Sequence, residues 1–209
     1  MNSARFRLAR AFALGALLTL PFCAAMGQEV AEKPTLKVGD QWVFTQSTDS
    51  GKESIWSRRI VAVGADGVAD VQTGPDKTQQ YDISWNFIDP RGAEYSRTPF
   101  KFPMRVGAEW SFTTKTGTNI IMDQRNSYKV VAYEPVTVPA GTFDCFKVDG
   151  KSEITYKASY NYTMNETYWY CPKVNSIAKI HRETTTRSRD SGSTREKTES
   201  QLTKYTPKS

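Results

Sequence analysis

The chain has 209 residues, of which 38% are hydrophobic and 12% aromatic, and its 28 basic and 22 acidic residues give a formal net charge of +6. Three of the basic residues fall in the first 27 positions, which hold no acid, so the rest of the chain carries only +3. Acidic residues are also mixed into the basic C-terminal tail. This balance lacks the basic face of a nucleic-acid-binding protein, and we expect no nucleic-acid partner.

The N-terminus has the anatomy of a secretory signal peptide. A basic stretch, MNSARFRLAR, precedes the apolar run AFALGALLTLPF, and Ala25 and Gly27 stand at the −3 and −1 positions of a cut before Gln28. The apolar run is shorter than the ~20 residues that a transmembrane helix needs. We therefore predict a signal peptide over 1–27, and no transmembrane segment in the mature chain. Cys23 is a weaker lipidation candidate, because the bulky Phe22 precedes it.

Residues 28–209 are long enough for a single β domain with one substantial core. Within it, LKVGDQWVF at 36–44 is nearly repeated by MRVGAEWSF at 104–112. In each copy a Val-Gly turn feeds a strand whose Trp and Phe alternate onto one face. The pattern predicts two related β-units, about 36–103 and 104–206. The alternative is that two unrelated strands share a turn-plus-Trp pattern.

Further strands follow in chain order. Strands are expected over 55–63 and 127–134, after the polar stretches that follow each repeat copy. YDISWNF, at 81–87, alternates apolar and polar residues and predicts a half-buried strand. SEITYKASYNYTM, at 152–164, does the same over a longer span and predicts one long strand, with a tight connection near Asn165 leading to the next.

The last strands form a predicted hairpin. SIAKIHRETTTRSR, at 176–189, and TREKTESQLTKYT, at 194–206, pair around the Asp-Ser-Gly-Ser turn at 190–193. Strands at such short intervals predict an all-β fold, an antiparallel curved sheet that forms a half-barrel or a sandwich. A second sheet, closure of the sheet on itself, or a ligand can cover its apolar face, and the pattern does not choose among them.

Two later stretches resemble a known group of proteins. VPAGTFDCFKV, at 138–148, and TYWYCPKVNSIAKI, at 167–180, resemble exported bacterial β-rich proteins that are mostly described as a domain of unknown function. The resemblance covers about 104–205 well and 36–103 loosely. It implies a periplasmic or secreted protein of the cell envelope, with a half-barrel similar to the lipoprotein-carrier class, and no established activity.

Cys145 and Cys171 are the only cysteines after the predicted leader. Because an exported chain meets an oxidising environment, we predict a disulfide between them, the alternative being two buried free thiols. The pattern of the resembled proteins does not require these cysteines. The chain has no C-x-x-C motif, which disfavours thiol exchange.

The sequence offers no catalytic or metal-binding cluster. His181 is the only histidine, and zinc sites draw on several His or Cys ligands at set spacings. Neither a phosphate-binding glycine motif nor a G-x-S-x-G motif occurs, and the carboxylates are scattered. We expect a non-enzyme with no cofactor and no metal. An uncharacterised hydrolase that uses His181 remains an alternative.

The aromatic strand residues are the strongest functional hint. Most of them are predicted to be core, but a curved sheet can also leave an aromatic cleft for a hydrophobic small molecule or a sugar, and an envelope protein is a second possible partner. The candidates are Trp42, Phe44, Tyr81, Trp85, Phe87, Trp110, Phe112, Tyr156, Tyr160 and Tyr162. The alternative to ligand binding is a structural or assembly module that contacts a partner along a sheet edge.

Overall fold

The computed structural model describes residues 29–157, 159–189 and 192–208. The predicted signal peptide and Cys23 lie outside the described residues. Two short 3₁₀ turns occur, η1 (Ala93–Tyr95) and η2 (Pro172–Val174), and the other elements are β-strands. No helix in the described part of the chain is long and apolar enough to span a membrane.

The main element is one antiparallel sheet of eleven strands in the order β6-β5-β4-β3-β2-β13-β12-β11-β10-β9-β8. The strands are β2 (Gln41–Thr48), β3 (Glu53–Val63), β4 (Ala69–Gly74), β5 (Lys77–Tyr81), β6 (Phe87–Ile88), β8 (Glu109–Thr116), β9 (Met122–Val138), β10 (Gly141–Tyr156), β11 (Tyr160–Cys171), β12 (Ser176–Ser188) and β13 (Gly192–Thr206). The short strands β1 (Val30–Ala31) and β7 (Met104–Arg105) form a separate pair.

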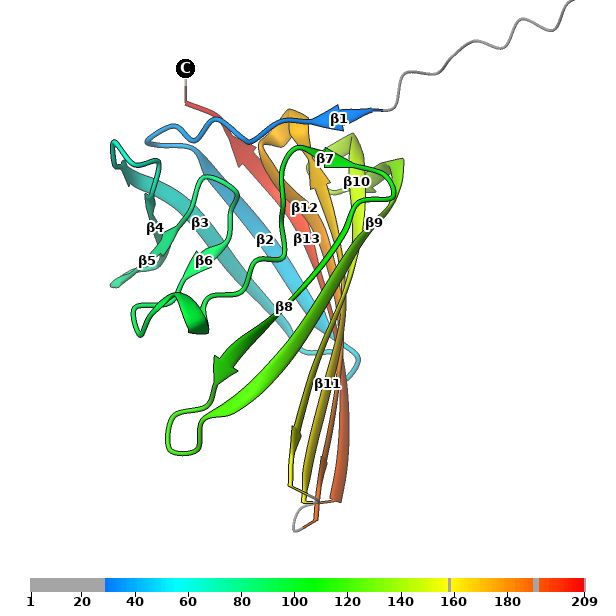
Figure 1. Cartoon of the computed structure of the whole chain (residues 1–209). Coiled ribbons are helices and arrows are strands. Elements are labelled where there is room, and N and C mark those ends of the chain that lie inside the picture. The colour runs from blue at the N-terminus through cyan, green and yellow to red at the C-terminus, as the bar shows by residue number, and fades with distance from the viewer. Residues whose placement is uncertain (1–28, 158, 190–191, 209) are drawn as a thin grey trace, which may run out of the picture.

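The sheet consists of two meanders, β2–β6 and β8–β13, joined where β13 pairs with β2. It is strongly curved, so that β3–β6 lie on one side and β8 and β9 on the other (Figure 1). The segment that connects β6 to β8 passes between these two sides (Figure 1). The expected curved antiparallel sheet is therefore confirmed in its half-barrel form. It is not a sandwich, because the described residues form no second large sheet.

The two copies of the repeat make the same turn at the start of each meander. Gly39 donates its N–H to the carbonyl of Ile60 at 2.8 Å, and Gly107 donates to the carbonyl of Val130 at 2.8 Å. Both glycines have positive φ, +97° and +89°, which a residue with a Cβ rarely adopts. The Val-Gly signal thus encodes one specific backbone turn, which ties the start of each meander to the following strand.

The core fills one end of the concave face. Its largest fully buried side chains are Trp42, Tyr170, Phe44, Phe146, Ile60, Met104 and Leu202. Trp42 donates its indole N–H to the carbonyl of Val174 at 2.8 Å, and Trp85 donates to the carbonyl of Asn175 at 2.7 Å. The two indoles meet edge to face with centroids 5.0 Å apart. The η2 turn is therefore held against the core by two buried donors.

The predicted disulfide is present. Cys145 and Cys171 are bonded and have no exposed surface, so the alternative of two free thiols is wrong. Residue 145 directly precedes the pair Phe146–Tyr170, so the bond crosses between β10 and β11 beside the core. The predicted hairpin of β12 and β13 is also confirmed by their antiparallel pairing.

The prediction of one strand over 81–87 is wrong. β5 ends at Tyr81 and β6 begins at Phe87, and a turn lies between them. The Asp82 carboxylate accepts hydrogen bonds from the backbone N–H groups of Ser84 and Asn86, both at 2.8 Å. Such Asx turns compete with strand pairing, and here the turn holds Trp85 at a positive φ of 63°.

The prediction of one strand over 152–164 is also wrong. The chain reverses at 157–159, where Lys157 has a positive φ of 52°, and Tyr156 pairs with Tyr160 across the hairpin. Asn165, where a tight connection was expected, lies inside β11 and pairs with Lys151. The error arose because the reversal keeps the alternation of apolar residues in phase on its two sides, so that periodicity alone does not reveal it.

Candidate functional site

The hollow of the sheet contains a pocket of about 340 Å³, which we call the upper pocket. Residues of β3, β5, β9, β11 and β12 line it on the sheet side, and the segment 87–100 and strand β8 close it from the other. Its aromatic lining consists of Tyr81, Trp85, Phe87, Tyr95, Phe100 and Tyr168. The volume falls at the small end of the range for small-molecule sites.

A second hollow of about 340 Å³, the lower pocket, lies farther along the same face. Its lining includes Ile154 and Met164, which are buried, and Tyr160 and Tyr162. The two pockets share four lining residues, Arg97, Thr116, Gln124 and Arg182. The concave face therefore has apolar surface on both sides of a shared polar zone.

Glu166 is the centre of this zone. Its side chain is 1% exposed and forms ion pairs with Arg97 and with Arg182, whose Nη2 lies 2.8 Å from Oε1. The Tyr168 hydroxyl donates to the same carboxylate at 2.7 Å. Arg97 also donates to the Tyr128 hydroxyl at 2.6 Å. We call Arg97, Tyr128, Glu166, Tyr168 and Arg182 the polar belt.

The belt fixes the charge states of its members. Burial would raise the pKa of Glu166, but the two guanidinium groups of Arg97 and Arg182 outweigh it and hold that pKa below its ordinary value. Burial would likewise lower the pKa of Arg97, and the Glu166 carboxylate raises it instead. The pKa of Tyr168 is raised, mainly by burial. Glu166 is therefore an ionised acceptor surrounded by donors.

Gly150 gives the belt its shape. This residue faces Tyr128 on β9 and Glu166 on β11 in the strand register. A Cβ at position 150 would lie 2.4 Å from Cε1 of Tyr128, so the tyrosine ring occupies the space above the glycine. An aromatic ring that covers a glycine on the neighbouring strand is a known stabilising arrangement in sheets. Here it brings the Tyr128 hydroxyl within reach of Arg97.

A chain of buried amides and hydroxyls continues from the belt. Ser152 donates to Asn126 at 2.7 Å, and Asn126 donates to Thr114 at 3.1 Å, so the chain reaches the edge strand β8. Gln124 also donates to Asn126, at 2.9 Å. Networks of satisfied buried polar groups rigidify their surroundings. The polar part of the concave face is thus preorganised.

Arg58 stands apart from the belt, at the aromatic end of the upper pocket. Its guanidinium carbon lies 5.3 Å from the ring centroid of Trp56, 5.1 Å from Tyr81 and 5.6 Å from Trp85. These distances are within the range of cation–π contact. In residues 29–157, 159–189 and 192–208 no carboxylate forms an ion pair with Arg58.

The structure separates the predicted aromatic face into several places. Trp42 and Phe44 have no exposed surface and belong to the core. Tyr81, Trp85 and Phe87 line the upper pocket, and Tyr160 and Tyr162 line the lower pocket. Trp110 and Phe112 line a third hollow, of about 430 Å³, on the other side of the covering segment. Tyr156 lies at the end of β10 beside Lys157.

Sequence reasoning missed the charged residues of the hollow, although alternation could have located them. In β11, Met164 and Tyr168 lie two residues before and two residues after Glu166, and both are buried. Arg58 lies between Trp56 and Ile60 in β3 in the same way. A charge within the buried phase of a strand indicates a paired or functional group.

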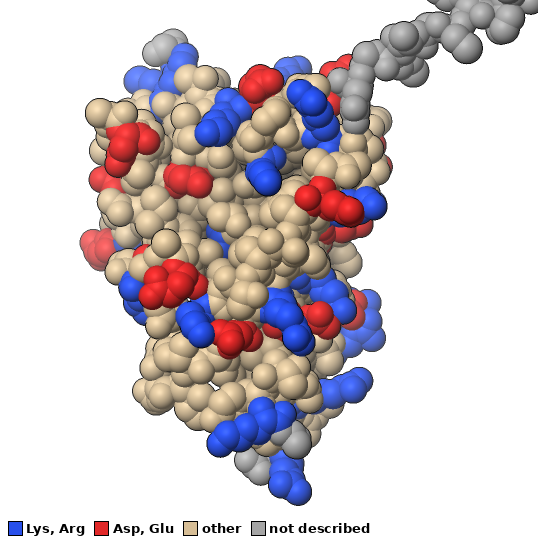
Figure 2. Space-filling view, viewed as in Figure 1, with Lys and Arg blue, Asp and Glu red and all other residues tan. Residues whose placement is uncertain are grey.

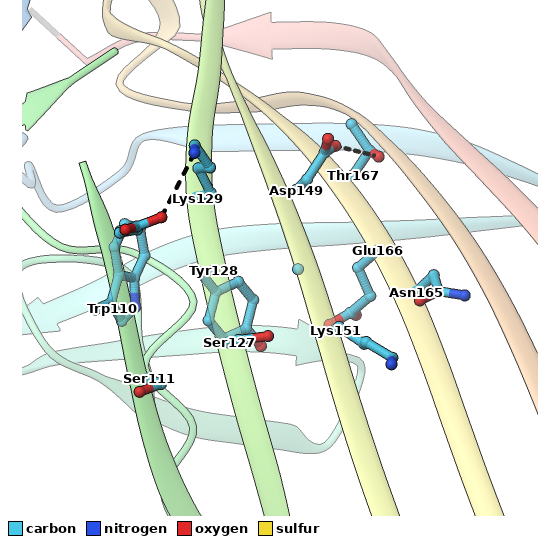
Figure 3. A pocket seen from close by; sticks show the side chains of 12 residues that line it. Trp110, Ser111, Ser127, Tyr128, Lys129, Asp149, Lys151, Asn165, Glu166 and Thr167 are labelled. Atoms are coloured by element: carbon cyan, nitrogen blue, oxygen red, sulfur yellow. Dashed lines mark hydrogen bonds and ion pairs between the residues drawn. The ribbon is translucent and has the colours of Figure 1, made fainter. Parts of the chain in front are cut away.

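A further hollow, of about 750 Å³, is a groove along β8–β11 (Figure 3). Its side chains pair with one another: Lys129 lies 3.5 Å from Glu109, and Thr167 donates to Asp149 at 2.8 Å. These four residues are exposed or half-exposed and lie on neighbouring strands, and dashed lines mark the two contacts in Figure 3. They do not converge on one point, so the concave hollow is the better candidate site.

Other chemistry is not assembled among the residues that the structure describes. No group of three or more His, Cys, Asp or Glu side chains in these ranges could hold a metal ion. His181 is exposed on β12 and points away from the hollow, because it alternates with Ile180 and Arg182, which line the upper pocket.

Comparison with known families finds one match. The family described as DUF3108-like matches residues 108–184. The matched span contains both stretches, 138–148 and 167–180, on which the resemblance to β-rich proteins of unknown function rests. No curated protein matches the chain at a significant level.

Solved structures with similar folds come from bacteria. A candidate exported protein with a YmcC-like fold from Bacteroides fragilis is 16% identical, with a TM-score of 0.43, over 85% of this chain and 100% of that one. A candidate lipoprotein from Parabacteroides distasonis is 14% identical, with a TM-score of 0.45, over 86% and 100%. The hypothetical lipoprotein YmcC from Escherichia coli is 6% identical, with a TM-score of 0.43, over 82% and 90%.

Proposed function

We propose that this protein is a non-catalytic, exported protein of the bacterial cell envelope that binds a small amphipathic molecule in the upper pocket. The observation that carries the proposal is the pocket itself: about 340 Å³ on the concave face of the sheet, with six aromatic residues and a few fixed polar groups in its lining. Small-molecule sites have this combination of apolar walls and few, well-placed polar groups.

Export rests on the predicted signal peptide at 1–27 and on the resemblance to exported β-rich proteins. Binding without catalysis is supported by the polar belt. The Glu166 carboxylate, the most deeply buried acid of the hollow, accepts from Arg97, Arg182 and Tyr168. A general base needs a free lone pair within reach of the substrate proton and a pKa near the working pH. The pKa of Glu166 is lowered instead, and its side chain is 1% exposed, so it does not meet these requirements.

A neutral fluorescent probe tests the pocket directly. N-phenyl-1-naphthylamine brightens when it enters an apolar site, and we expect a saturable increase with the wild-type protein. Thr116 lines both pockets from the end of β8, so Thr116→Trp should fill their shared space and weaken binding. Thr113, exposed on the other face of the same strand, supplies the matched control Thr113→Trp.

Calorimetry with the same probe separates binding from any change in fluorescence yield caused by the new indole. The proposal fails if wild-type protein does not bind the probe saturably, or if Thr116→Trp binds it as well as Thr113→Trp does.

A further inference from the structure

We infer that the ligand of the upper pocket carries an anionic group, and that Arg58 binds this group at the aromatic end of the pocket. The inference rests on the proposed function, because it specifies the chemistry of a ligand for the same pocket. It assigns an acidic amphiphile: an apolar ring or chain that ends in a carboxylate, sulfonate or phosphate.

The first step is the pairing of the charges around the pocket. Arg91 is paired with Asp89 at 2.7 Å, and Lys115 with Asp123 at 2.6 Å. The remaining two cations of the lining, Arg97 and Arg182, share the carboxylate of Glu166. Among the described residues that line the upper pocket, Arg58 is the cation without a carboxylate partner.

The second step is the environment of Arg58. The residue is half-buried, and its guanidinium lies among Trp56, Tyr81 and Trp85, of which Tyr81 and Trp85 line the pocket with it. Aromatic faces attract a cation but supply no hydrogen-bond acceptor for its five N–H groups. A partly desolvated guanidinium with unmet donors is a binding site for a carboxylate, sulfonate or phosphate, whose oxygens accept two parallel bonds.

The third step is the balance of basic and acidic side chains around the pocket. Its lining has five basic residues and one acidic residue, Asp89, and the Glu166 carboxylate that faces it is shared by two arginines. On the face shown in Figure 2, acidic and basic side chains are interspersed over most of the surface, and basic side chains alone appear at its lower end. The excess of basic residues in the pocket lining favours an anion over a cation or a neutral polar molecule.

Two probes that differ by one sulfonate group test this inference. 8-Anilino-1-naphthalenesulfonate has the skeleton of N-phenyl-1-naphthylamine plus one sulfonate. We expect the wild-type protein to bind the sulfonate about tenfold more tightly, the factor that corresponds to about 1.4 kcal/mol. Arg58→Gln should remove most of this preference, with a much smaller effect on the neutral probe. Arg59 is exposed on the opposite face of β3, and Arg59→Gln removes the same charge as the control.

The outcomes separate the two proposals. Loss of saturable binding for the neutral probe would overturn the proposed function. If the neutral probe binds but the sulfonate binds no more tightly, or if Arg58→Gln and Arg59→Gln lower the preference equally, the pocket stands and the anionic ligand is rejected. Arg58→Lys keeps the charge and should retain part of the preference, so it provides the test if Arg58→Gln does not fold, as judged by near-ultraviolet circular dichroism.

Discussion

Glu166→Gln is the substitution that tests the polar belt most directly. Glutamine keeps the size of the side chain and an oxygen that can accept from Tyr168, but it removes the negative charge shared by Arg97 and Arg182. The two guanidinium groups then repel each other beside a buried neutral amide. We expect the folded state to lose stability and the segment that contains Arg97 to be held less firmly over the sheet.

The magnitude follows from the burial of the three partners. Removing one member of a fully buried ion pair costs about 3–5 kcal/mol, because a buried charge is left uncompensated. Here the carboxylate is 1% exposed, but the side chains of Arg97 and Arg182 are 28% and 39% exposed, so water can solvate part of each charge. We therefore expect a loss of about 2–3 kcal/mol in the free energy of unfolding.

Urea unfolding, followed by circular dichroism and tryptophan fluorescence, measures the loss. Glu153 forms an exposed ion pair with Lys151, and Glu153→Gln is the matched control, for which we expect a change of at most about 0.5 kcal/mol. The two variants lose the same charge on adjacent strands. If Glu166→Gln were no less stable than Glu153→Gln, the belt would have no structural role and the reasoning would be wrong.

The pH dependence gives an independent check of the same group. The pKa of Glu166 in the folded protein lies below the ordinary value of 4.5. A depressed pKa contributes stability above the ordinary pKa, and that contribution is lost as the pH falls through the folded value. The stability difference between wild type and Glu166→Gln should thus be largest near neutral pH and narrow in acid below pH 4.5. A difference that stays constant down to pH 3 would contradict this assignment.

Three further changes test other parts of the fold. Reduction of the Cys145–Cys171 bond, which joins residues 26 positions apart, should lower the free energy of unfolding by about 3–4 kcal/mol, and the oxidised mature protein, which lacks Cys23, should gain no mass with an alkylating agent. Gly150→Ala should cost about 1–2 kcal/mol in urea unfolding because the new Cβ meets the Tyr128 ring, and should cost less in a Tyr128→Leu background. Asp82→Ala removes the acceptor of two turn bonds and should lower the melting temperature by several degrees, whereas equal stability would show that the turn holds without it.

Sequence patterns predicted the strands where one face is buried and the turn signal is strong. The strand expected over 55–63 corresponds to β3, the turn at 190–193 correctly predicted the pairing of β12 with β13, and the Val-Gly signal located the two turns that start the meanders. The disulfide was predictable because export and two remaining cysteines leave few alternatives. The turns depend on residues that are near one another in sequence, and the disulfide has only one possible pair of cysteines.

The hairpin at 157–159 and the turn at 82–86 were not predictable from periodicity. In both places the apolar alternation continues in phase across the reversal, so the pattern of a single strand and of two connected strands is the same. The deciding interactions are the backbone hydrogen bonds that the Asp82 carboxylate accepts and the pairing of Tyr156 with Tyr160. Neither produces a glycine or proline signal in the sequence.

The candidate site was less accessible to sequence reasoning, because its residues come from distant strands. The curvature of the sheet and the path of the segment between β6 and β8 place Arg58 and Arg97 in the lining of one pocket and pair Arg97 with Glu166. Three of the six aromatic residues of the pocket, Tyr81, Trp85 and Phe87, were among the sequence candidates, whereas Tyr95, Phe100 and Tyr168 were not. The charged residues were not among the candidates either, because a charge on a strand is ordinarily taken to face water.

The distribution of polar groups also explains why the hollow stays open. A curved sheet with an entirely apolar concave face gains free energy when its sides close and bury that face. Here closure would have to desolvate Arg58 and the partly exposed side chains of Arg97 and Arg182, and no acid among the described residues forms an ion pair with Arg58. The core at one end thus holds the sheet together, while the cations beyond it oppose collapse. The proposed ligand, with an apolar body and a negative charge, would remove that opposition, and a purely apolar molecule would leave it in place.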